Sequence, residues 1–511
     1  MSSMILSIDQ GTTGTKVLVM DSDLKPVAEH YAPFDQHFPS PGQVEHDCEQ
    51  IWSSVTAGLE AVSKKVDTTR ISAIGITNQR ETICFWERDT LRPLRRAIVW
   101  QDRRTSARCE SLRQAGHEGR IQDKTGLIID PYFSGTKLEW ALKNDPGVAK
   151  AAQERRLQVG TIDSFLLGRL TGGVTHATDT SNASRTLLMN LKTLDWDPEL
   201  LGLFGVNAEI LPKILPTFGE FGRTRGLGVL PDGIPVTGMI GDQQSALLGQ
   251  AAIHPGMAKC TYGTGAFLLM NTGKEIKKST SRLLTTVAWS GAGGEVAYAL
   301  EGSAFMAGAV VQWLRDGLGI IRASGEVEAL AKSVQSSEGV MLVPAFTGLG
   351  APHWDPEARA VISGLTRGST RAHIARAALE GIALQNVDIL QAMERDLGAP
   401  IQLLSVDGGA CKNDLLMQIQ ADLLGRKLRR PVLTETTAIG AVFAAGLGAG
   451  IWKSLNDVEG AWKLEREFEP AMSPEDRDDH LKKWRLAIER LRFKSDSKSH
   501  SHDESDANEY P

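Results

Sequence analysis

Three short segments place charged and polar side chains directly after apolar runs. Asn78 to Glu81 (NQRE) follows the first run, Trp100 and Gln101 follow the second, and Gly241 to Gln244 (GDQQ) follows the third. Polar groups at strand ends of an α/β sheet are where ligands bind. These side chains could therefore bind a polar substrate. The alternatives are a surface ion pair within NQRE and a core position for the tryptophan.

Two turns rich in Gly and Thr, Gly11 to Thr15 and Gly263 to Gly265, each separate two apolar runs. Glycine lets the backbone come close to a ligand, so that N–H groups can point at phosphate oxygens. Threonine hydroxyls add further donors. The P-loop and Rossmann glycine motifs are missing from the sequence. The turns thus favour a phosphate site of another kind, although an ordinary hairpin would have the same composition.

Asp9 stands at the end of the apolar run before the first turn. A carboxylate there would repel phosphate unless a metal ion lay between them, and Mg²⁺ takes only one or two protein carboxylates. The alternative is a carboxylate that only caps the turn. Two glycine–amide pairs, Gly308 with Gln312 and Gly409 with Asn413, each have helical spacing and so share a face. They suit an adenosine moiety between two helices, or else simple helix packing.

The elements that position these residues form an α/β fold with helical patterns between the strands. Each glycine turn joins two strands, as in a hairpin, and Ser303 is expected to cap the helix that carries Gly308. A last helix is expected to be capped by Ser473, to begin at Pro474 and to have one apolar face. The expected strands are 4–8, 17–20, 71–77, 97–100, 259–262 and 266–270, and the apolar face is Leu481, Trp484, Ile488 and Leu491. A third glycine turn is expected at 403–410, with a helix from about Asn413.

The chain of 511 residues is too long for one hydrophobic core. Two similar glycine hairpins about half a chain apart predict two similar domains that face one cleft, with the boundary near Gln250. We expect domains at 1–250 and 251–493. The segment 494–511 is rich in Ser, Asp and His and is predicted to be disordered.

Composition excludes several classes of protein. A net charge of -6 argues against nucleic-acid and membrane-surface binding. The five cysteines form no C-x-x-C pair, which favours buried reduced thiols over zinc or disulfides. No signal peptide is visible, and the uncharged stretch 436–452 is too short and too rich in Gly and Ala to span a membrane. We therefore expect a soluble cytoplasmic protein.

The motifs together make the sequence resemble the glycerol kinase branch of the FGGY carbohydrate kinases, in the actin-like ATPase superfamily. NQRET and WQ-x-RRT are specific to the glycerol branch, whereas the phosphate turns identify only the superfamily. The resemblance extends from about residue 4 to about residue 453. The matching stretches are 8–13, 78–82, 98–101, 179–185 (DTSNASR), 241–244, 261–265, 344–352, 364–368 and 407–410.

The resemblance implies two actin-like, ribonuclease H-like domains with ATP, Mg²⁺ and glycerol in the cleft between them. Asp242 would be the general base and would join Asp9 at the metal. The glycerol site would be Arg80, Glu81, Trp100, Tyr132, Asp242, Gln243 and Phe267. The nucleotide site would be Thr12, Thr13, Gly14, Lys16, Gly263, Thr264, Gly308, Gln312, Gly409, Ala410 and Asn413.

The sequence also departs from some relatives. Lys16 stands where many bacterial relatives have Arg, which keeps the charge but loses the planar fork. The segment Gly226 to Gly241 has no basic residue, and no His lies between His176 and His254. We therefore expect neither the fructose 1,6-bisphosphate inhibition nor the His phosphorylation that regulate some relatives. A homo-oligomer, dimer or tetramer, is expected. Alternative functions are a kinase for another small polyol or sugar and a non-catalytic actin-like protein.

Overall fold

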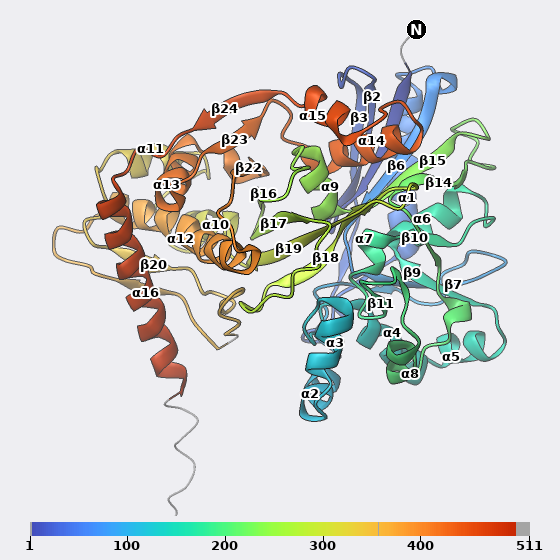
Figure 1. Cartoon of the computed structure of the whole chain (residues 1–511), viewed down its shortest axis with the longest axis horizontal. Helices are drawn as coiled ribbons and strands as arrows, with labels where there is room; N and C mark the ends of the chain where they lie inside the picture. Colours follow the sequence, from blue (N-terminus) through green and yellow to red (C-terminus); the bar gives the residue numbers. More distant parts are fainter. Residues whose placement is uncertain (1–2, 356, 497–511) are drawn as a thin grey trace, which may run out of the picture.

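The computed structural model describes residues 3–355 and 357–496, and two large mixed sheets organise it (Figure 1). The first sheet has six strands in the order β14-β15-β6-β1-β2-β3. Its central strands are buried along almost their whole length, so they are continuous apolar runs rather than alternating ones. The bounds are β1 Met4–Gln10, β2 Gly14–Asp21, β3 Pro26–Pro33, β6 Ile71–Asn78, β14 Phe218–Arg223 and β15 Pro235–Gly241.

The second sheet has seven strands in the order β18-β19-β17-β16-β22-β23-β24. From β19 to β24 its strand directions repeat those of the first sheet from β3 to β14: two antiparallel, two parallel and one antiparallel pairing. The expected duplication of an α/β unit is confirmed. The bounds are β16 Met257–Tyr262, β17 Ala266–Gly273, β18 Leu284–Ser290, β19 Val296–Ala304, β22 Leu403–Asp407, β23 Leu428–Pro431 and β24 Leu464–Phe468.

Strand register brings the predicted site residues to one edge of each sheet. In the first sheet Asn78 at the end of β6 is opposite Gln10 on one side and Gly241 on the other. In the second sheet Thr261 of β16 is opposite Asp407 at the end of β22. Because parallel strands end together, the polar residues that follow them must lie side by side.

Two helices, α9 (Asp242–Gly249) and α14 (Thr436–Gly448), lie between the two sheets (Figure 1). Helix α14 packs on the first sheet and on α9, which in turn packs on β16 and β17. Glycines allow this approach, since a Cβ on Gly440 would come within 1.9 Å of the Ser245 carbonyl oxygen. The prediction of a buried helix within 436–452 is confirmed.

A smaller five-stranded sheet and several helices extend the first half of the chain. The strand order of this sheet is β4-β5-β8-β7-β9. The loop that contains Tyr132 connects two of the helices beside it. The bounds are β4 Gln36–His37, β5 Glu45–His46, β7 Ile83–Glu87, β8 Ala97–Ile98, β9 Leu157–Thr161, α1 Cys48–Ser63, α2 Ser106–Gln114, α3 Glu118–Thr125, α4 Ser134–Asn144, α5 Pro146–Gln153, α6 Ile162–Leu170, α7 Thr180–Ala183 and α8 Pro198–Phe204. Short strands complete this half: β10 Ala177–Asp179, β11 Met189–Asn190, β12 Asp195–Trp196 and β13 Lys213–Leu215.

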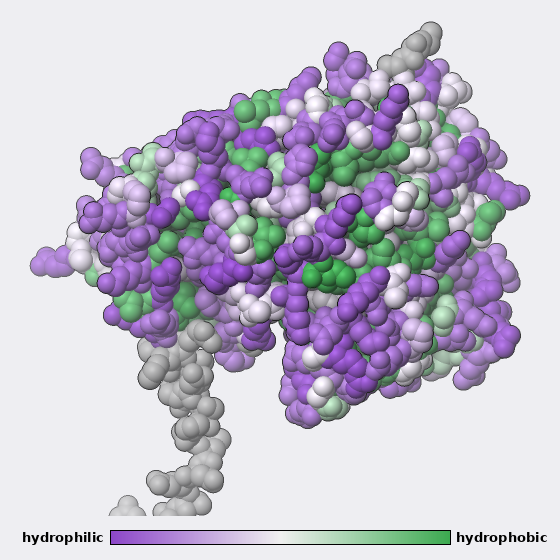
Figure 2. Space-filling view, in the orientation of Figure 1, coloured by the Kyte–Doolittle hydropathy of each residue, from purple (hydrophilic) through white to green (hydrophobic). Residues whose placement is uncertain are grey.

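Helices cover the second sheet, and the longest of them, α12, runs through the core of this half (Figure 1). Hydrophilic side chains cover most of the face shown in Figure 2, as expected when the apolar residues lie in the cores beneath. The bounds are α10 Gly308–Asp316, α11 Glu326–Lys332, α12 Arg371–Leu397, α13 Asp414–Leu424, α15 Leu455–Ala461, α16 Pro474–Asp496, β20 Met341–Val343 and β21 Val361–Ser363.

Three details differ from the sequence predictions. The expected strand 97–100 ends at Ile98, because the Val99 and Asp102 backbone N–H groups turn to bond Val44 and Val99 carbonyls. Ser303 caps no helix, since it pairs with Phe267 inside β19 and α10 begins only at Gly308. Helix α16 continues to Asp496, past the expected end at 493.

Several other expectations can be compared directly. Ser473 does cap α16, where its hydroxyl oxygen accepts the Asp476 N–H at 3.1 Å. All five cysteines are buried free thiols. Every helix within the described ranges is too short or not apolar enough to cross a membrane. The rest of the predicted disordered tail, 497–511, lies outside the described residues.

Candidate active site

A short helix, α7, ties together the strand ends that carry the candidate site. Asp179 caps it by accepting the Ser181 and Asn182 N–H groups. Asn182 exchanges amide hydrogen bonds with Asn78 at the end of β6, and the Ser181 hydroxyl oxygen accepts the Gly241 N–H at 2.9 Å. The DTSNASR segment therefore fixes the two strand ends from which Arg80 and Asp242 emerge.

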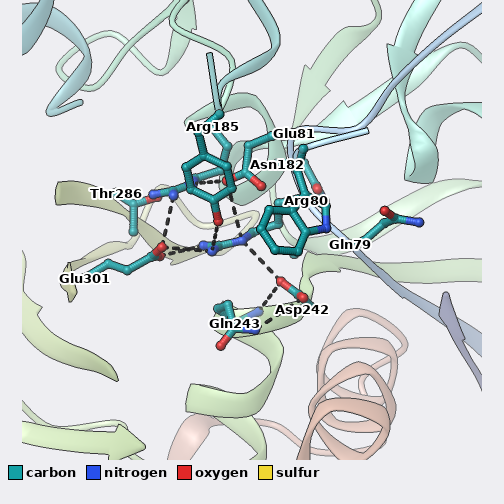
Figure 3. Close-up of polar contacts among 12 residues, drawn as sticks. Gln79, Arg80, Glu81, Asn182, Arg185, Asp242, Gln243, Thr286 and Glu301 are labelled. Carbon is teal, nitrogen blue, oxygen red and sulfur yellow. Dashed lines mark hydrogen bonds and ion pairs between the residues drawn. The ribbon is translucent and has the colours of Figure 1, made fainter. Parts of the chain in front are cut away.

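Arg80 lies at the centre of the site, fully buried between Glu301 and Asp242 (Figure 3). Its Nη1 and Nη2 donate to the two carboxylate oxygens of Glu301 at 2.6 and 2.9 Å. Nη1 also donates to Gln244, and Nε lies 3.2 Å from Asp242 Oδ1. Paired oxygens facing a planar guanidinium give a strong and directional contact. The orientation of Arg80 is thus fixed from the second sheet, because Glu301 belongs to β19.

Glu81 is also buried, and its backbone has φ 61°, in the left-handed region that non-glycine residues rarely adopt. Arg185 Nε donates to its carboxylate at 2.6 Å, and the Ser134 hydroxyl donates to its carbonyl oxygen at 3.0 Å. Burial raises the pKa of Glu81, although Arg80 and Arg185 oppose the shift. Such backbone strain is typical of functional sites whose surroundings hold it in place.

Asp242 begins α9 and is half-buried, with its carboxylate open to the site. The Gln243 amide contacts it, with Nε2 3.3 Å from Asp242 Oδ2. The same amide accepts from Lys259 Nζ at 2.5 Å, and Lys259 also donates to Thr261. Burial lowers the pKa of Lys259, while Asp407 and Asp242 act in the opposite direction. Lys259 therefore fixes which end of the Gln243 amide faces Asp242.

Two aromatic rings form one wall of the site. Trp100 and Tyr132 meet edge to face with centroids 5.7 Å apart, and the Tyr132 hydroxyl lies 3.4 Å from Arg80 Nη2. Trp100 Nε1 also donates to the Thr12 hydroxyl at 3.0 Å, which connects this wall to the first glycine turn. Phe267 is half-buried on β17, and the ring contacts found among the described residues do not join it to this pair.

Buried polar contacts hold the Tyr132 loop. Asp130 accepts the Tyr132 N–H at 2.8 Å and pairs with Arg103 of the WQ-x-RRT segment. Lys137 is fully buried in α4 and donates to the Tyr132 carbonyl oxygen at 2.6 Å. Burial lowers the pKa of Lys137 to about 7. Arg103, which follows Trp100 in the WQ-x-RRT segment, therefore has a structural role: it holds Asp130, which in turn holds the Tyr132 loop.

The first glycine turn joins β1 and β2, with the Gly11 N–H bonded to the Gly14 carbonyl at 2.9 Å. Gly14 has no room for a side chain, since a Cβ would come within 2.4 Å of the Tyr31 hydroxyl. The Thr13 side chain bonds the same hydroxyl at 3.2 Å. Lys16 does not point freely into the site: its Nζ lies 3.1 Å from Glu435 and 3.3 Å from Glu29.

Asp9 is the second-last residue of β1, close to this turn and opposite Thr77 in the register. Burial and the nearby carboxylates of Asp242 and Glu435 raise its pKa to about 7, although Lys16 opposes the shift. A buried carboxylate with two others nearby would accept a divalent cation as counter-charge, so the residues fit Mg²⁺. Among the described residues no group of three metal-binding side chains is present.

The second glycine turn lies against the helix that was expected to hold adenosine. The Gly263 and Thr264 carbonyl oxygens accept the Gly308 and Ala307 N–H groups at 2.9 and 2.8 Å. A Cβ on Gly408 would come within 2.5 Å of the Tyr262 carbonyl oxygen, so the third glycine turn also packs here. These contacts bring together the three glycine segments of the second sheet.

The predicted adenosine residues stand around these turns. Gln312 is exposed on α10. Gly409 and Ala410 lie in a 3₁₀ turn, Gly409–Lys412. The Asn413 side chain already caps α13 by accepting the Leu416 N–H at 2.9 Å. Gly409 has open space beside it, which leaves room for a ligand to approach its backbone.

Sequence reasoning missed three charged residues of the site. Glu301 and Lys259 are each the only charged residue of a long apolar stretch, 297–310 and 257–270. A single charge in a buried strand needs a partner, and this signal could have found both. Arg185 was quoted within DTSNASR but was given no role, although it bonds both Glu81 and Glu301.

Comparison with known proteins adds family relationships to this geometry. The sequence profile of the FGGY family of carbohydrate kinases, N-terminal domain, matches residues 4–249, and that of the C-terminal domain matches residues 258–449. The chain is 55% identical to a glycerol kinase of Bdellovibrio bacteriovorus over 493 residues, which cover 96% of this chain and 100% of the relative. It is 53% identical to a glycerol kinase of Myxococcus xanthus, over 95% of this chain and 99% of the relative.

A solved structure of Plasmodium falciparum glycerol kinase with ADP is also similar. Its TM-score is 0.91, with 38% sequence identity over 96% of this chain and 98% of that chain. The similarity therefore covers both sheets, the glycine turns and the helices between the sheets.

Proposed function

This chain belongs to the FGGY family of carbohydrate kinases, and we propose that it transfers the γ-phosphoryl group of ATP to glycerol. The product is sn-glycerol 3-phosphate. Relatives named glycerol kinase match nearly the whole chain at 50–55% identity, which supports glycerol rather than a larger sugar as the acceptor. ATP is the second substrate, as the kinase family and the ADP-bound neighbour indicate.

One observation carries the proposal. Arg80, Asp242 and the Trp100–Tyr132 wall converge at the strand ends of the first sheet, and a hydrogen bond from Trp100 joins them to the first glycine turn. A site for hydroxyl groups thus lies directly beside a site suited to phosphates. A non-catalytic nucleotide-binding protein would need only the latter.

Charged and polar side chains bind the acceptor, and the aromatic rings keep water out of the acceptor site. Arg80, Glu81 and Gln243 are placed to bond the glycerol hydroxyls, and charged partners bind hydroxyls more strongly than neutral ones. Trp100 and Tyr132 would cover the carbon edge, and Phe267 of β17 is proposed to join them when the substrates bind. The rings also limit access of water, which would otherwise compete with glycerol as acceptor.

Asp242 takes the proton of the attacking hydroxyl. As the new bond forms between the glycerol oxygen and the γ-phosphorus, the bond to the β–γ bridging oxygen breaks and ADP leaves. The nearby Gln243 amide and Arg80 guanidinium keep the Asp242 carboxylate aimed at the acceptor. Phosphoryl transfer needs such positioning more than covalent help from the protein.

The glycine turns hold the nucleotide. Thr12, Thr13, Gly14 and Lys16 on one side and Gly263 and Thr264 on the other face the phosphates, and Gly308, Gln312, Gly409, Ala410 and Asn413 hold adenosine. Phosphates can replace the carboxylates that pair with Lys16. Asp9 and Asp242 would hold Mg²⁺, which when bound offsets the negative charge of the phosphates.

A coupled assay of ATP consumption across a panel of polyols and sugars tests the proposal. We expect the highest kcat/KM for glycerol and a much lower value for propane-1,2-diol, since a site built to bond a hydroxyl penalises its loss. A higher kcat/KM for xylulose or ribulose would instead identify a kinase for another sugar.

Three expectations continue to rest on the sequence. We propose the domain division at Gln250, with the family profiles matching 4–249 and 258–449 on either side of it. Assembly into a dimer or tetramer and a cytoplasmic location stay predictions. Sedimentation of the purified protein would determine the first of these two.

A further inference from the structure

We infer that Glu301 is a positioning residue that orients Arg80 toward the acceptor hydroxyls, so that the acceptor site depends on both halves of the chain. The inference rests on the proposed phosphorylation of glycerol. It gives a role to a residue of the second sheet, whereas Arg80 and Asp242 both belong to the first half. Glu301 does not contact the substrate itself; it acts through Arg80.

The contact between Glu301 and Arg80 fixes the orientation of the planar Arg80 guanidinium as well as its position. Both carboxylate oxygens of Glu301 accept from Arg80, at 2.6 Å from Nη1 and 2.9 Å from Nη2. With that edge of the guanidinium occupied, Nε faces Asp242 at 3.2 Å and Nη2 also faces the Tyr132 hydroxyl at 3.4 Å (Figure 3). The group therefore presents its remaining hydrogens toward the base and the aromatic wall.

Glu301 is itself held firmly. Its backbone pairs with Leu269 of β17 on one side and Leu284 of β18 on the other. Its side chain is 2% exposed and also accepts from Arg185 Nη2 at 3.0 Å. Burial alone would raise the pKa of Glu301, but Arg185 and Arg80 lower it to about 2, so the carboxylate is charged at any working pH.

Loss of Glu301 would leave Arg80 with two other carboxylates. Glu81 Oε1 lies 3.8 Å from Arg80 Nε, and Asp242 Oδ1 lies 3.2 Å from it. Arg80 would turn toward them and away from the acceptor. Closer pairing with Asp242 would also occupy the carboxylate that must accept the proton. We therefore expect effects on both glycerol binding and turnover.

The experiment compares glycerol with propane-1,2-diol in wild type and Glu301→Gln. In the variant we expect kcat/KM for glycerol to fall about 100-fold, as small misplacements of a positioning group can do. The ratio of kcat/KM for glycerol to that for propane-1,2-diol should shrink roughly tenfold, since the misplaced Arg80 no longer rewards the extra hydroxyl. The KM for ATP should stay within about twofold. A merely structural role would lower both acceptors alike, because the ratio does not depend on the fraction of folded enzyme.

Glu301→Asp keeps the buried charge but cannot reach both nitrogens, and it serves also where Glu301→Gln fails to fold. It should lose glycerol preference as well; a wild-type ratio in this variant would show that charge alone matters and would overturn the inference. Asp123→Asn is the matched control, because Asp123 pairs with Lys278 across the two halves at an exposed place. Its ratio should equal that of wild type. A wild type inactive on glycerol would refute the proposed function, whereas an active wild type with unchanged ratio in Glu301→Gln would refute only this inference.

Discussion

Buried charged side chains form the candidate site, and each one contacts a partner from another element. Arg80 follows β6, Arg185 follows α7, Glu301 lies on β19 and Lys259 on β16. A buried charge without a partner is costly, so each position is specified by its neighbours. Substitutions at these positions should therefore act on geometry as well as on charge.

Asp242→Asn tests the proposed base directly. Asparagine keeps the size of the side chain but cannot accept the proton, so kcat should fall by roughly 10²-fold or more. Glycerol and ATP should still bind, as measured by calorimetry, because Arg80 remains paired with Glu301. Turnover close to that of wild type would remove Asp242 from the role of base.

Lys137 predicts a dependence of stability on pH. Its pKa is about 7 in the folded chain because the side chain is buried, against an ordinary value of 10.5. Between these values the unfolded chain binds a proton that the folded chain does not, so the free energy of unfolding should rise with pH. The contribution reaches at most ~1.4 kcal/mol per pH unit and should be missing in Lys137→Met.

Chemical unfolding at several pH values from 7 to 10 measures this difference. The wild-type curve should rise more steeply than that of Lys137→Met. Lys150→Met changes an exposed lysine and should reproduce the wild-type slope. Parallel curves for wild type and Lys137→Met would mean that folding does not remove a proton from Lys137 in this pH range.

At the residue scale, the sequence predicted which polar residues would lie together where the motif itself carries charged side chains, and the roles of these residues stay predictions. Arg80, Asp242 and Gln243 follow apolar runs, and the structure does place them together. Glu301 was missed because its partner, Arg80, lies more than a hundred residues away in the sequence. Lys259 was missed because its partner, Gln243, belongs to a different element, helix α9. Local spacing holds no information on such pairings.

At the scale of elements, helices α9 and α14 are in close backbone contact. A Cβ on Gly249 would come within 2.0 Å of the Thr436 carbonyl oxygen, and one on Gly440 would come within 1.9 Å of the Ser245 carbonyl oxygen. Backbone cannot yield as a flexible side chain can. An added side chain at this contact would therefore push α9 away from α14, and Asp242 is the first residue of α9.

Gly440→Ala should for this reason reduce both stability and activity. Overpacking costs typically 1–3 kcal/mol, and the displaced α9 should lower kcat for glycerol. Gly119→Ala is the matched control, since Gly119 is also helical and has open space beside it. Alanine is the better helix former, so that variant should be at least as stable as wild type. Thermal melts and kcat measurements for both variants decide the matter, and equal melting temperatures would contradict the packing argument.

The elements themselves were predicted well where pattern and turn agreed. Both glycine hairpins and the final helix lie where apolar runs and turn residues indicated. Ser303 was misassigned because a serine before a helical pattern is an ordinary cap signal, whereas pairing with Phe267 continues the strand. Tertiary pairing overrides a local preference of this kind.

At the scale of the whole molecule, the loop between β14 and β15 bears on regulation. Arg225 lies within the loop and is exposed. Arg223, the last residue of β14, already pairs with Glu220 through Nε and Nη2 at 2.8 Å each. It also donates to the Gly233 carbonyl oxygen, and the Gly226 N–H bonds Asp232. The loop therefore offers a bisphosphate few free donors.

Activity should accordingly be unchanged by millimolar fructose 1,6-bisphosphate, because several negative charges need cations to bind. The measurement is a titration at fixed protein concentration, since effector binding can be linked to assembly. Saturable inhibition that Arg223→Ala or Arg225→Ala abolishes would show that the loop rearranges into a bisphosphate site.

The position of α14 has a consequence for how the protein is made. Phe443 and Val442 of this helix complete one apolar core with Ile5 and Ile240 of the first sheet. A ribosome releases that sheet long before it synthesises α14, so nascent chains must wait with one face of the sheet uncovered. Translation speed and chaperone capture over the last third of the message should thus govern the yield of active protein. A truncated message encoding only residues 1–250 should give aggregates, which co-translation of residues 251–511 would reduce.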